Sequence, residues 1–182
     1  SAHVVGASMG GMITQVFAAK YPQRVRSVGI IFSSTNQPFL PPPKPSALKP
    51  LMSGPGKSAT REQIIAHSAK FMRTIGSPKY PFTQDELVAM ATELNARSYH
   101  PAGVVRQFNA IIGTGSLKAM TRQIDKPTVV IHGTADPLVR PACGKAIARN
   151  IPKARLVMIP GMGHDLPPGV WERITHALIV TA

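Results

Sequence analysis

Short apolar runs alternate with longer segments of helical periodicity along this chain. Each run is continuously apolar, which is typical of parallel strands that are covered on both faces. The segments between the runs repeat their apolar positions every three to four residues, as amphipathic helices do. This succession predicts an α/β fold with a short, mostly parallel sheet of about four strands flanked by helices. We expect strands at 4–7, 26–32, 127–132 and 154–159, and flanking helices at 10–21, 141–150 and 167–180.

The middle of the chain interrupts this alternation. Seven of the 18 prolines fall within residues 38–55, and the triple proline at 41–43 predicts a stiff, extended connector, because proline fits neither a helix interior nor a central strand. Three helices are expected after it, at 60–75, 83–96 and 101–112. We therefore divide the chain into an α/β core, formed by residues 1–36 and 117–182, and a proline-rich connector with a helical cap, formed by residues 37–116.

Composition narrows the classes of function. The formal net charge is +13, from 21 Lys and Arg against 8 Asp and Glu. These basic residues are spread along the sequence without a dense run or an interleaved aromatic platform, so we expect no nucleic-acid partner. No apolar run reaches the length of a membrane span. Cys143 is the single cysteine, which excludes an internal disulfide, and we expect a cytoplasmic protein without a metal site.

The first candidate catalytic motif lies at residues 6–10, between the first expected strand and the first expected helix. Its sequence is Gly-Ala-Ser-Met-Gly. A G-x-S-x-G sequence in this context places its serine on a sharp turn, with the hydroxyl exposed above the sheet. We expect Gly6 and Gly10 at points where a Cβ atom would collide with a neighbouring element. The Met9 amide is expected at the helix N-terminus, where it stabilises an oxyanion. A glycine-rich turn with a chance Ser8 is the simpler alternative, and the strand–turn–helix context favours the catalytic interpretation.

Two further polar residues follow predicted strands. Asp136 follows the third strand and His164 the fourth, so both are expected with Ser8 at the edge where parallel strands end. A serine hydroxyl needs a neutral imidazole to take its proton, and the imidazole needs a carboxylate to orient it. Asp165 adjoins His164 and would have difficulty reaching its Nδ1 atom. Asp125 precedes its strand and belongs to the opposite edge.

The other histidines fit structural roles better. His132 ends a strand near the expected site, and we interpret it as packing or loop support. The rest are expected at the surface or at the far end of a strand, and they are His3, His67, His100 and His176.

The motifs around Ser8, Asp136 and His164 together resemble those of the α/β-hydrolase family. The resemblance rests on residues 6–11, on 132–139 (His-Gly-Thr-Ala-Asp-Pro-Leu-Val) and on 160–164 (Pro-Gly-Met-Gly-His). Within the family, the chain is similar to small serine esterases of the aclacinomycin methylesterase type, with further likeness at 151–156. The resemblance implies Ser8 as the nucleophile, Asp136 as the acid and His164 as the base, and it implies no cofactor.

One part of the family pattern is missing. Family members carry about four strands before the serine-bearing strand, whereas this sequence begins on it. We therefore expect the strand at 4–7 to be an open edge that pairs with a second copy of the chain or with the missing N-terminal half. The early strands also supply the second oxyanion amide in the family, so Met9 is the one donor expected here.

The sequence thus predicts a serine hydrolase that cleaves uncharged carboxylic esters with small to medium acyl chains, through an acyl-serine intermediate. Its pocket is expected to be apolar and lined by cap residues, namely Phe71, Met72, Phe108, Ile111 and Ile112. The alternative is a catalytically weak or inactive α/β-hydrolase fragment that acts as an assembly or interaction module. The missing early strands favour the fragment, and the three motifs in order favour the enzyme.

Overall fold

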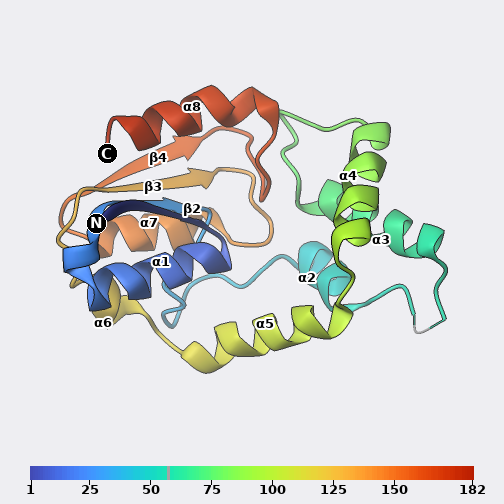
Figure 1. Cartoon of the computed structure of the whole chain (residues 1–182), viewed down its shortest axis with the longest axis horizontal. Coiled ribbons are helices and arrows are strands. Elements are labelled where there is room, and N and C mark those ends of the chain that lie inside the picture. The colour runs from blue at the N-terminus through green and yellow to red at the C-terminus, as the bar shows by residue number, and fades with distance from the viewer. Residues whose placement is uncertain (57) are drawn as a thin grey trace.

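A parallel sheet positions the other elements of the molecule. The computed structural model describes residues 1–56 and 58–182, and four strands within these ranges form one sheet (Figure 1). Their order in space equals their order in the sequence. Because every neighbouring pair is parallel, all four carboxyl ends meet at one edge. This confirms the predicted α/β class and the short parallel sheet. The strands are β1 (Ala2–Ala7), β2 (Val25–Ile31), β3 (Thr128–Gly133) and β4 (Ala154–Ile159).

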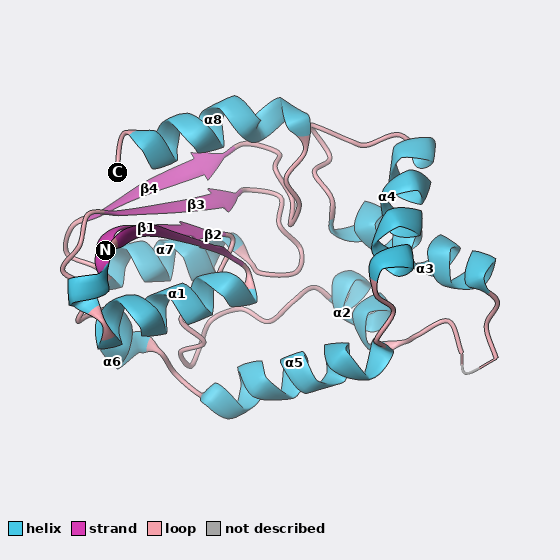
Figure 2. Cartoon of the chain, in the orientation of Figure 1, coloured by secondary structure: helices cyan, strands magenta, loops and turns pink. Residues whose placement is uncertain are grey.

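Helices cover both faces of this sheet. Helices α1 (Met9–Lys20) and α7 (Pro141–Asn150) lie on one face beside the short α6 (Lys118–Thr121), and α8 (Pro168–Ile179) lies on the other (Figure 2). Helices α1 and α7 share a face because crossovers between parallel strands have one hand. A short turn, η1 (Pro22–Arg24), leads from α1 into β2. Across residues 1–56 and 58–182, no helix has both the length and the apolar character that crossing a membrane requires.

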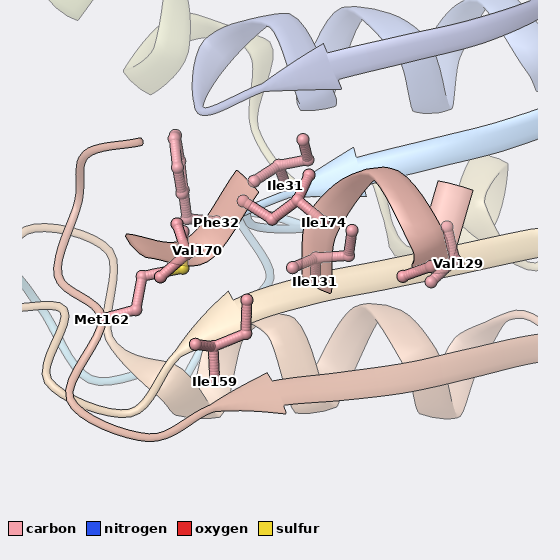
Figure 3. Close-up of a cluster of buried hydrophobic side chains, with 9 residues drawn as sticks. Ile31, Phe32, Val129, Ile131, Ile159, Met162, Val170 and Ile174 are labelled. Atoms are coloured by element: carbon pink, nitrogen blue, oxygen red, sulfur yellow. The ribbon is translucent and has the colours of Figure 1, made fainter. Parts of the chain in front are cut away.

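Strand β3 carries the centre of the core. Val129 and Ile131 pack toward α8, whereas Val130 packs toward α1 and α7. Figure 3 shows Ile131 near Ile174 of α8, within the buried cluster that also includes Val129. All three β3 side chains are fully buried, and burial of each stabilises the fold by about 1.5–3 kcal/mol. The continuous apolar run in the sequence therefore reflects a strand that is covered on both faces.

The proline-rich connector contains a helix that the sequence pattern did not predict. The triple proline belongs to neither a helix nor a strand, but the segment after it forms α2 (Pro45–Met52). Pro45 lies in the first turn, where its missing amide has no helical partner to lose. Pro50 removes one helical hydrogen bond, and the helix ends shortly after it. The Lys44 amide donates to the Pro137 carbonyl oxygen at 2.8 Å, which ties the start of α2 to the loop after β3.

Three longer helices stand beyond the carboxyl ends of the strands (Figure 1), and they are α3 (Arg61–Ile75), α4 (Gln84–Arg97) and α5 (Pro101–Thr114). The Thr60 side chain accepts a hydrogen bond from the Gln63 amide and caps α3. Thr83 and Glu86 repeat this capping box at the start of α4. Helices α3 and α4 share a small apolar core of their own, whereas no residue of α5 is buried.

A buried glutamine joins three elements beside the sheet. Gln15 of α1 is 0% exposed, and its amide nitrogen donates to the carbonyl oxygens of Gly11 at 3.0 Å and Ser34 at 3.1 Å. Its amide oxygen accepts a hydrogen bond from the Thr121 hydroxyl at 2.8 Å. One side chain therefore links α1, the loop after β2, and α6, with both of its polar ends satisfied.

The substitution Thr121→Val tests this link. Valine keeps the shape of threonine but leaves the buried Gln15 oxygen without its donor, so we expect a loss of about 1–3 kcal/mol in the free energy of unfolding. Urea unfolding followed by circular dichroism measures it. The matched control is Thr175→Val, because Thr175 is exposed and bonds only within its own helix. Equal stability of the two variants would contradict the assigned role of Gln15.

Candidate active site

The turn from β1 into α1 holds Ser8 in an unusual backbone conformation. Ser8 has φ 54° and ψ −121°, in the half of backbone space that residues other than glycine rarely occupy. Its amide donates to the Ile31 carbonyl oxygen at 2.9 Å, and its carbonyl oxygen accepts from the Gly11 amide at 3.0 Å. Such strain costs about 1–3 kcal/mol and persists only where the surroundings hold it. Strand β2 and the first turn of α1 therefore fix the position of the serine.

The glycines around Ser8 are required unequally. At Gly6 a Cβ atom would lie 2.2 Å from the Gly10 carbonyl oxygen, so α1 starts too close to β1 for any side chain there. At Gly10 a Cβ atom would meet no described atom within 4 Å. The collision expected at Gly10 is therefore wrong, because that position faces open space. The second tight position is Gly11, where a Cβ atom would lie 2.6 Å from the Cβ atom of Ser33.

The loop after β4 brings His164 to Ser8. The His164 Nε2 atom lies 3.0 Å from the Ser8 Oγ atom, and its Nδ1 atom lies 2.7 Å from the Asp136 Oδ2 atom. A carboxylate only accepts hydrogen bonds, so Nδ1 donates to Asp136 and Nε2 accepts from the serine hydroxyl. The Phe32 ring packs against the imidazole, with 4.5 Å between the ring centroids. His164 is only 9% exposed, which limits competition from water.

The loop after β3 supplies the carboxylate and keeps it ionised. Asp136 is 2% exposed, and its Oδ1 atom accepts from the amides of Leu138 at 2.9 Å and Val139 at 2.8 Å. Burial alone would raise the pKa of Asp136. Hydrogen bonds and charge from His132 and His164 outweigh burial and hold that pKa below its ordinary value. The arrangement thus places a buried carboxylate against one edge of the His164 imidazole.

His132 is a neighbour of this carboxylate and is completely buried. Its Nε2 atom donates to the Val139 carbonyl oxygen at 2.8 Å and lies 3.5 Å from the Asp136 Oδ2 atom. The side chain is 0% exposed, and a Cβ atom on Gly144 would lie 2.4 Å from its Nδ1 atom. These contacts place it beneath the Asp136 loop, in agreement with its interpretation as packing or loop support.

Asp165 and Asp125, which the sequence did not favour as partners of His164, bond to other groups. Asp165 accepts hydrogen bonds from the amide of Ser77 at 3.1 Å and from the Ser77 hydroxyl, not from His164. Burial raises the pKa of Asp165, against the opposing effect of these hydrogen bonds. Asp125 is exposed and lies 3.8 Å from the Lys126 ammonium group.

The segment after α3 is bonded to the loop that carries His164. The Gly163 amide donates to the Ser77 hydroxyl oxygen at 2.8 Å, and the His164 amide donates to the Ile75 carbonyl oxygen at 2.7 Å. The Lys79 amide adds a bond to the Gly161 carbonyl oxygen at 3.3 Å. The position of His164 therefore depends on residues 75–79 as well as on β4. No local sequence pattern identifies Ser77 as a partner of this loop.

Met9 occupies the place that the sequence predicted for an anion-binding amide. It is the first residue of α1, directly after Ser8. The first amides of a helix have no partner within it and carry partial positive charge. The site combines this helix start with a hydroxyl, an imidazole and a carboxylate. Within residues 1–56 and 58–182, no group of three His, Cys, Asp or Glu side chains is arranged to hold a metal ion.

A cavity of about 240 Å³ opens at Ser8 and Met9. Phe108 and Ile111 of α5 line it, as the sequence suggested, together with Met12, Leu51, Val104 and Leu138.

The other three pocket residues lie elsewhere. Phe71 and Met72 line a separate cavity of about 490 Å³, and Ile112 lines a third cavity of about 270 Å³. Their place in the substrate pocket therefore stays a prediction. Leu51 of α2 and Val104 of α5 line both the Ser8 cavity and the second one, and α2 was absent from the prediction.

Sequence reasoning also missed the residues that support the triad from β2. Phe32 has φ 35° and packs on His164, and the Ser33 hydroxyl donates to the Ser8 carbonyl oxygen at 2.7 Å. A usable signal existed, because the apolar run of β2 ends abruptly in Phe32 followed by Ser-Ser-Thr. That polar cluster lies at the carboxyl edge, where sites form in parallel sheets.

Comparisons with known proteins agree with this geometry. The rhodomycin D methylesterase of Streptomyces sp. strain C5 is 26% identical over 98% of this chain, which spans 65% of that relative. The pimeloyl-[acyl-carrier protein] methyl ester esterase of Chromobacterium violaceum is 24% identical over 90% of the chain, which spans 63% of it.

A solved structure shows the same fold. The 2-hydroxy-6-oxo-6-phenylhexa-2,4-dienoate hydrolase of Rhodococcus sp. strain RHA1 superposes with a TM-score of 0.75 at 19% identity, over all of this chain and 63% of that one. The chain therefore corresponds to about two thirds of the length of these relatives. The model of the serine aminopeptidase S33 family matches residues 1–167. The chain belongs to this family of α/β-hydrolases.

Proposed function

We propose that this chain carries the catalytic machinery of a serine esterase. The observation that carries the proposal is the continuous hydrogen-bonded series from Ser8 through His164 to Asp136, with bonds of 3.0 Å and 2.7 Å. His164 Nε2 takes the hydroxyl proton as Ser8 Oγ attacks the ester carbonyl carbon. The Met9 amide stabilises the resulting oxyanion. His164 then returns the proton to the departing alcohol, which leaves an acyl-serine.

Hydrolysis of the acyl-serine repeats these steps with water. His164 takes a proton from water, the hydroxide attacks the acyl carbon, and the proton returns to Ser8 as the acid leaves. Asp136 holds the imidazole in the tautomer that presents an unprotonated Nε2 atom to Ser8, and it stabilises the imidazolium that forms. A carboxylate with a lowered pKa suits this role because it stays charged throughout the cycle.

We propose esters with small to medium acyl chains as substrates. Relatives in two bacteria carry the names methylesterase and methyl ester esterase, which support a carboxylic ester with a small alcohol part. The cavity at Ser8 has a volume of about 240 Å³ and a mostly apolar wall, which suits a short apolar group. We propose that residues 37–116 act as a cap, because α2 and α5 contribute Leu51, Val104 and Phe108 to that wall.

A second candidate function is assembly through β1. This strand pairs only with β2 and forms an edge of the sheet as it is described. Its Val5 side chain is 50% exposed, and a short apolar edge favours pairing with another strand. We propose that a second copy of the chain, or a separate N-terminal half, pairs there. A partner at this edge would also offer a second oxyanion donor, whose loss costs about 10²–10³ in rate.

The substitution Ser8→Ala tests the esterase. We expect the wild-type chain to hydrolyse p-nitrophenyl acetate and butyrate, and the variant to lose at least about 10³-fold in kcat, because alanine has no nucleophile. Ser98→Ala, at an exposed position remote from the cavity, is the control and should keep full activity. A folded wild-type chain without turnover, or equal turnover in Ser8→Ala, would refute the proposed function.

Asp136→Asn separates the electrostatic role of Asp136 from its packing. We expect kcat to fall by about 10⁴-fold because the imidazole adopts the wrong tautomer. Asp125→Asn removes the same charge at an exposed site and should leave kcat unchanged.

The same variant reports on stability. The pKa of Asp136 is lowered from an ordinary value of 3.8, so its charge stabilises the fold above that value, and this contribution is lost as pH falls through the folded-state pKa. The stability difference between wild type and Asp136→Asn, measured by urea unfolding, should shrink below about pH 4. A difference that grows toward acid pH would contradict the assignment.

The substitution Val5→Lys tests whether β1 pairs with a strand of a second copy of the chain. A charged side chain on an edge strand opposes strand pairing, so we expect it to lower the apparent mass in size exclusion with light scattering across a dilution series. Val88→Lys, on the exposed part of α4, is the control. A wild-type chain that stays monomeric at every concentration would contradict assembly of copies through β1.

A further inference from the structure

Arg140 is a partly buried cation without an anionic partner. It follows the Asp136 loop and immediately precedes α7. Among the residues that the structure describes, no Asp or Glu forms an ion pair with it, and its Nε atom is buried without a hydrogen-bond partner. A guanidinium group removed from water costs free energy unless an anion or a hydrogen-bond acceptor replaces the water.

Two other polar side chains of the same cavity have hydrogen-bond partners of their own. The Gln37 side-chain oxygen accepts hydrogen bonds from the Thr35 hydroxyl at 3.1 Å and from the Asn150 amide group at 3.2 Å. The Ser34 hydroxyl oxygen accepts from the Asn36 amide at 2.9 Å. Neither side chain forms a hydrogen bond with Arg140 among the described residues.

The cavity at Arg140 adjoins the cavity at Ser8. Arg140 lines a cavity of about 270 Å³. The same apolar side chains, including Met12, Phe108 and Ile111, line both cavities. A molecule whose ester lies at Ser8 would extend past these apolar side chains to reach Arg140.

Arg140 is the one charged side chain among the described residues that line this cavity. The other titratable group in the wall is the Cys143 thiol, and burial raises its pKa, so it stays neutral. The planar guanidinium group of an arginine matches the geometry of a carboxylate, which it binds through two parallel hydrogen bonds. Arg140 presents such a group in a cavity with a largely apolar wall.

We propose that Arg140 binds a carboxylate at the far end of the substrate, so that the preferred ester carries a negative charge remote from the scissile bond. This inference rests on the proposed esterase function and names its substrate class. It differs from the expectation of uncharged esters, because no sequence pattern indicated that this arginine lines a cavity. The apolar wall then accommodates the chain between the ester and the carboxylate.

The test compares charged and neutral esters of equal shape. Half-methyl esters of dicarboxylic acids of increasing length are compared with the corresponding methyl ester amides, in which a primary amide replaces the carboxylate. A second series, acetyl esters of ω-hydroxy acids and of their amides, places the charge on the alcohol side. We expect wild type to favour the acid by about 10- to 100-fold in kcat/KM in at least one series, the usual effect of a charged hydrogen bond.

Variants of Arg140 identify the source of the preference. Arg140→Gln should reduce the ratio of acid to amide to about one, and Arg140→Lys should retain part of it, since lysine keeps the charge without the planar fork. The Arg140 side chain makes no capping bond to α7, so both variants should fold. Arg173→Gln removes an exposed arginine from α8 and should leave the ratio unchanged. A wild-type ratio near one in both series, or a ratio that Arg140→Gln does not change, overturns the proposal.

A binding measurement separates this inference from the proposed function. Calorimetric titration of Ser8→Ala with the half-amides of the same dicarboxylic acids needs no turnover. Binding that weakens at least about tenfold on adding Arg140→Gln supports the carboxylate site, even if no ester is hydrolysed. In that case the esterase proposal fails while the binding site stands. Binding that is independent of Arg140 overturns the site, whatever the outcome for hydrolysis.

Discussion

The strained turn at Ser8 is the constraint on which the rest of the site depends. It is stable because the Ile31 carbonyl oxygen of β2 accepts from the Ser8 amide, and because Gly6 has no Cβ atom, which would lie 2.2 Å from the Gly10 carbonyl oxygen of α1. The hydroxyl then has one direction to face, toward the carboxyl edge of the sheet. Parallel strands in sequential order deliver Asp136 and His164 to that same edge. Partners that are 156 residues apart in the sequence therefore meet at 3.0 Å.

The loop that carries His164 is shaped from two directions. Strand β4 sets where the loop begins, and the segment after α3 bonds to it through Ser77, Ile75 and Lys79. Asp165 closes this contact by accepting both the amide and the hydroxyl of Ser77. A displacement of residues 75–79 would therefore also displace the His164 imidazole. Residues 75–79 and the loop that carries His164 are therefore linked through hydrogen bonds.

The sequence predicted those parts of the site that local pattern controls. The strands, their order and the positions of Ser8, Asp136 and His164 follow from apolar periodicity and from motifs at strand ends. Features that depend on tertiary packing were missed or wrong. Helix α2 was not predicted because of its prolines, and its Leu51 lines both the Ser8 cavity and the cavity that Phe71 and Met72 line. Open space at Gly10 depends on how far neighbouring segments stand from the turn, which no local motif records.

The loop after β3 carries two opposite charges, Asp136 and Arg140, which differ in how far the surrounding residues balance them. The loop after β3 begins with Asp136, whose charge is balanced by two backbone amides and the imidazoles of His132 and His164. It ends with Arg140, for which the described residues provide no such balance. Because the Leu138 and Val139 amides bind Asp136, the backbone between the two charges is held in one conformation. The same loop thus fixes the Asp136 carboxylate behind the His164 imidazole and carries Arg140 to the adjoining cavity. Under the two proposals above, the fold therefore sets the separation between the ester and a carboxylate bound at Arg140.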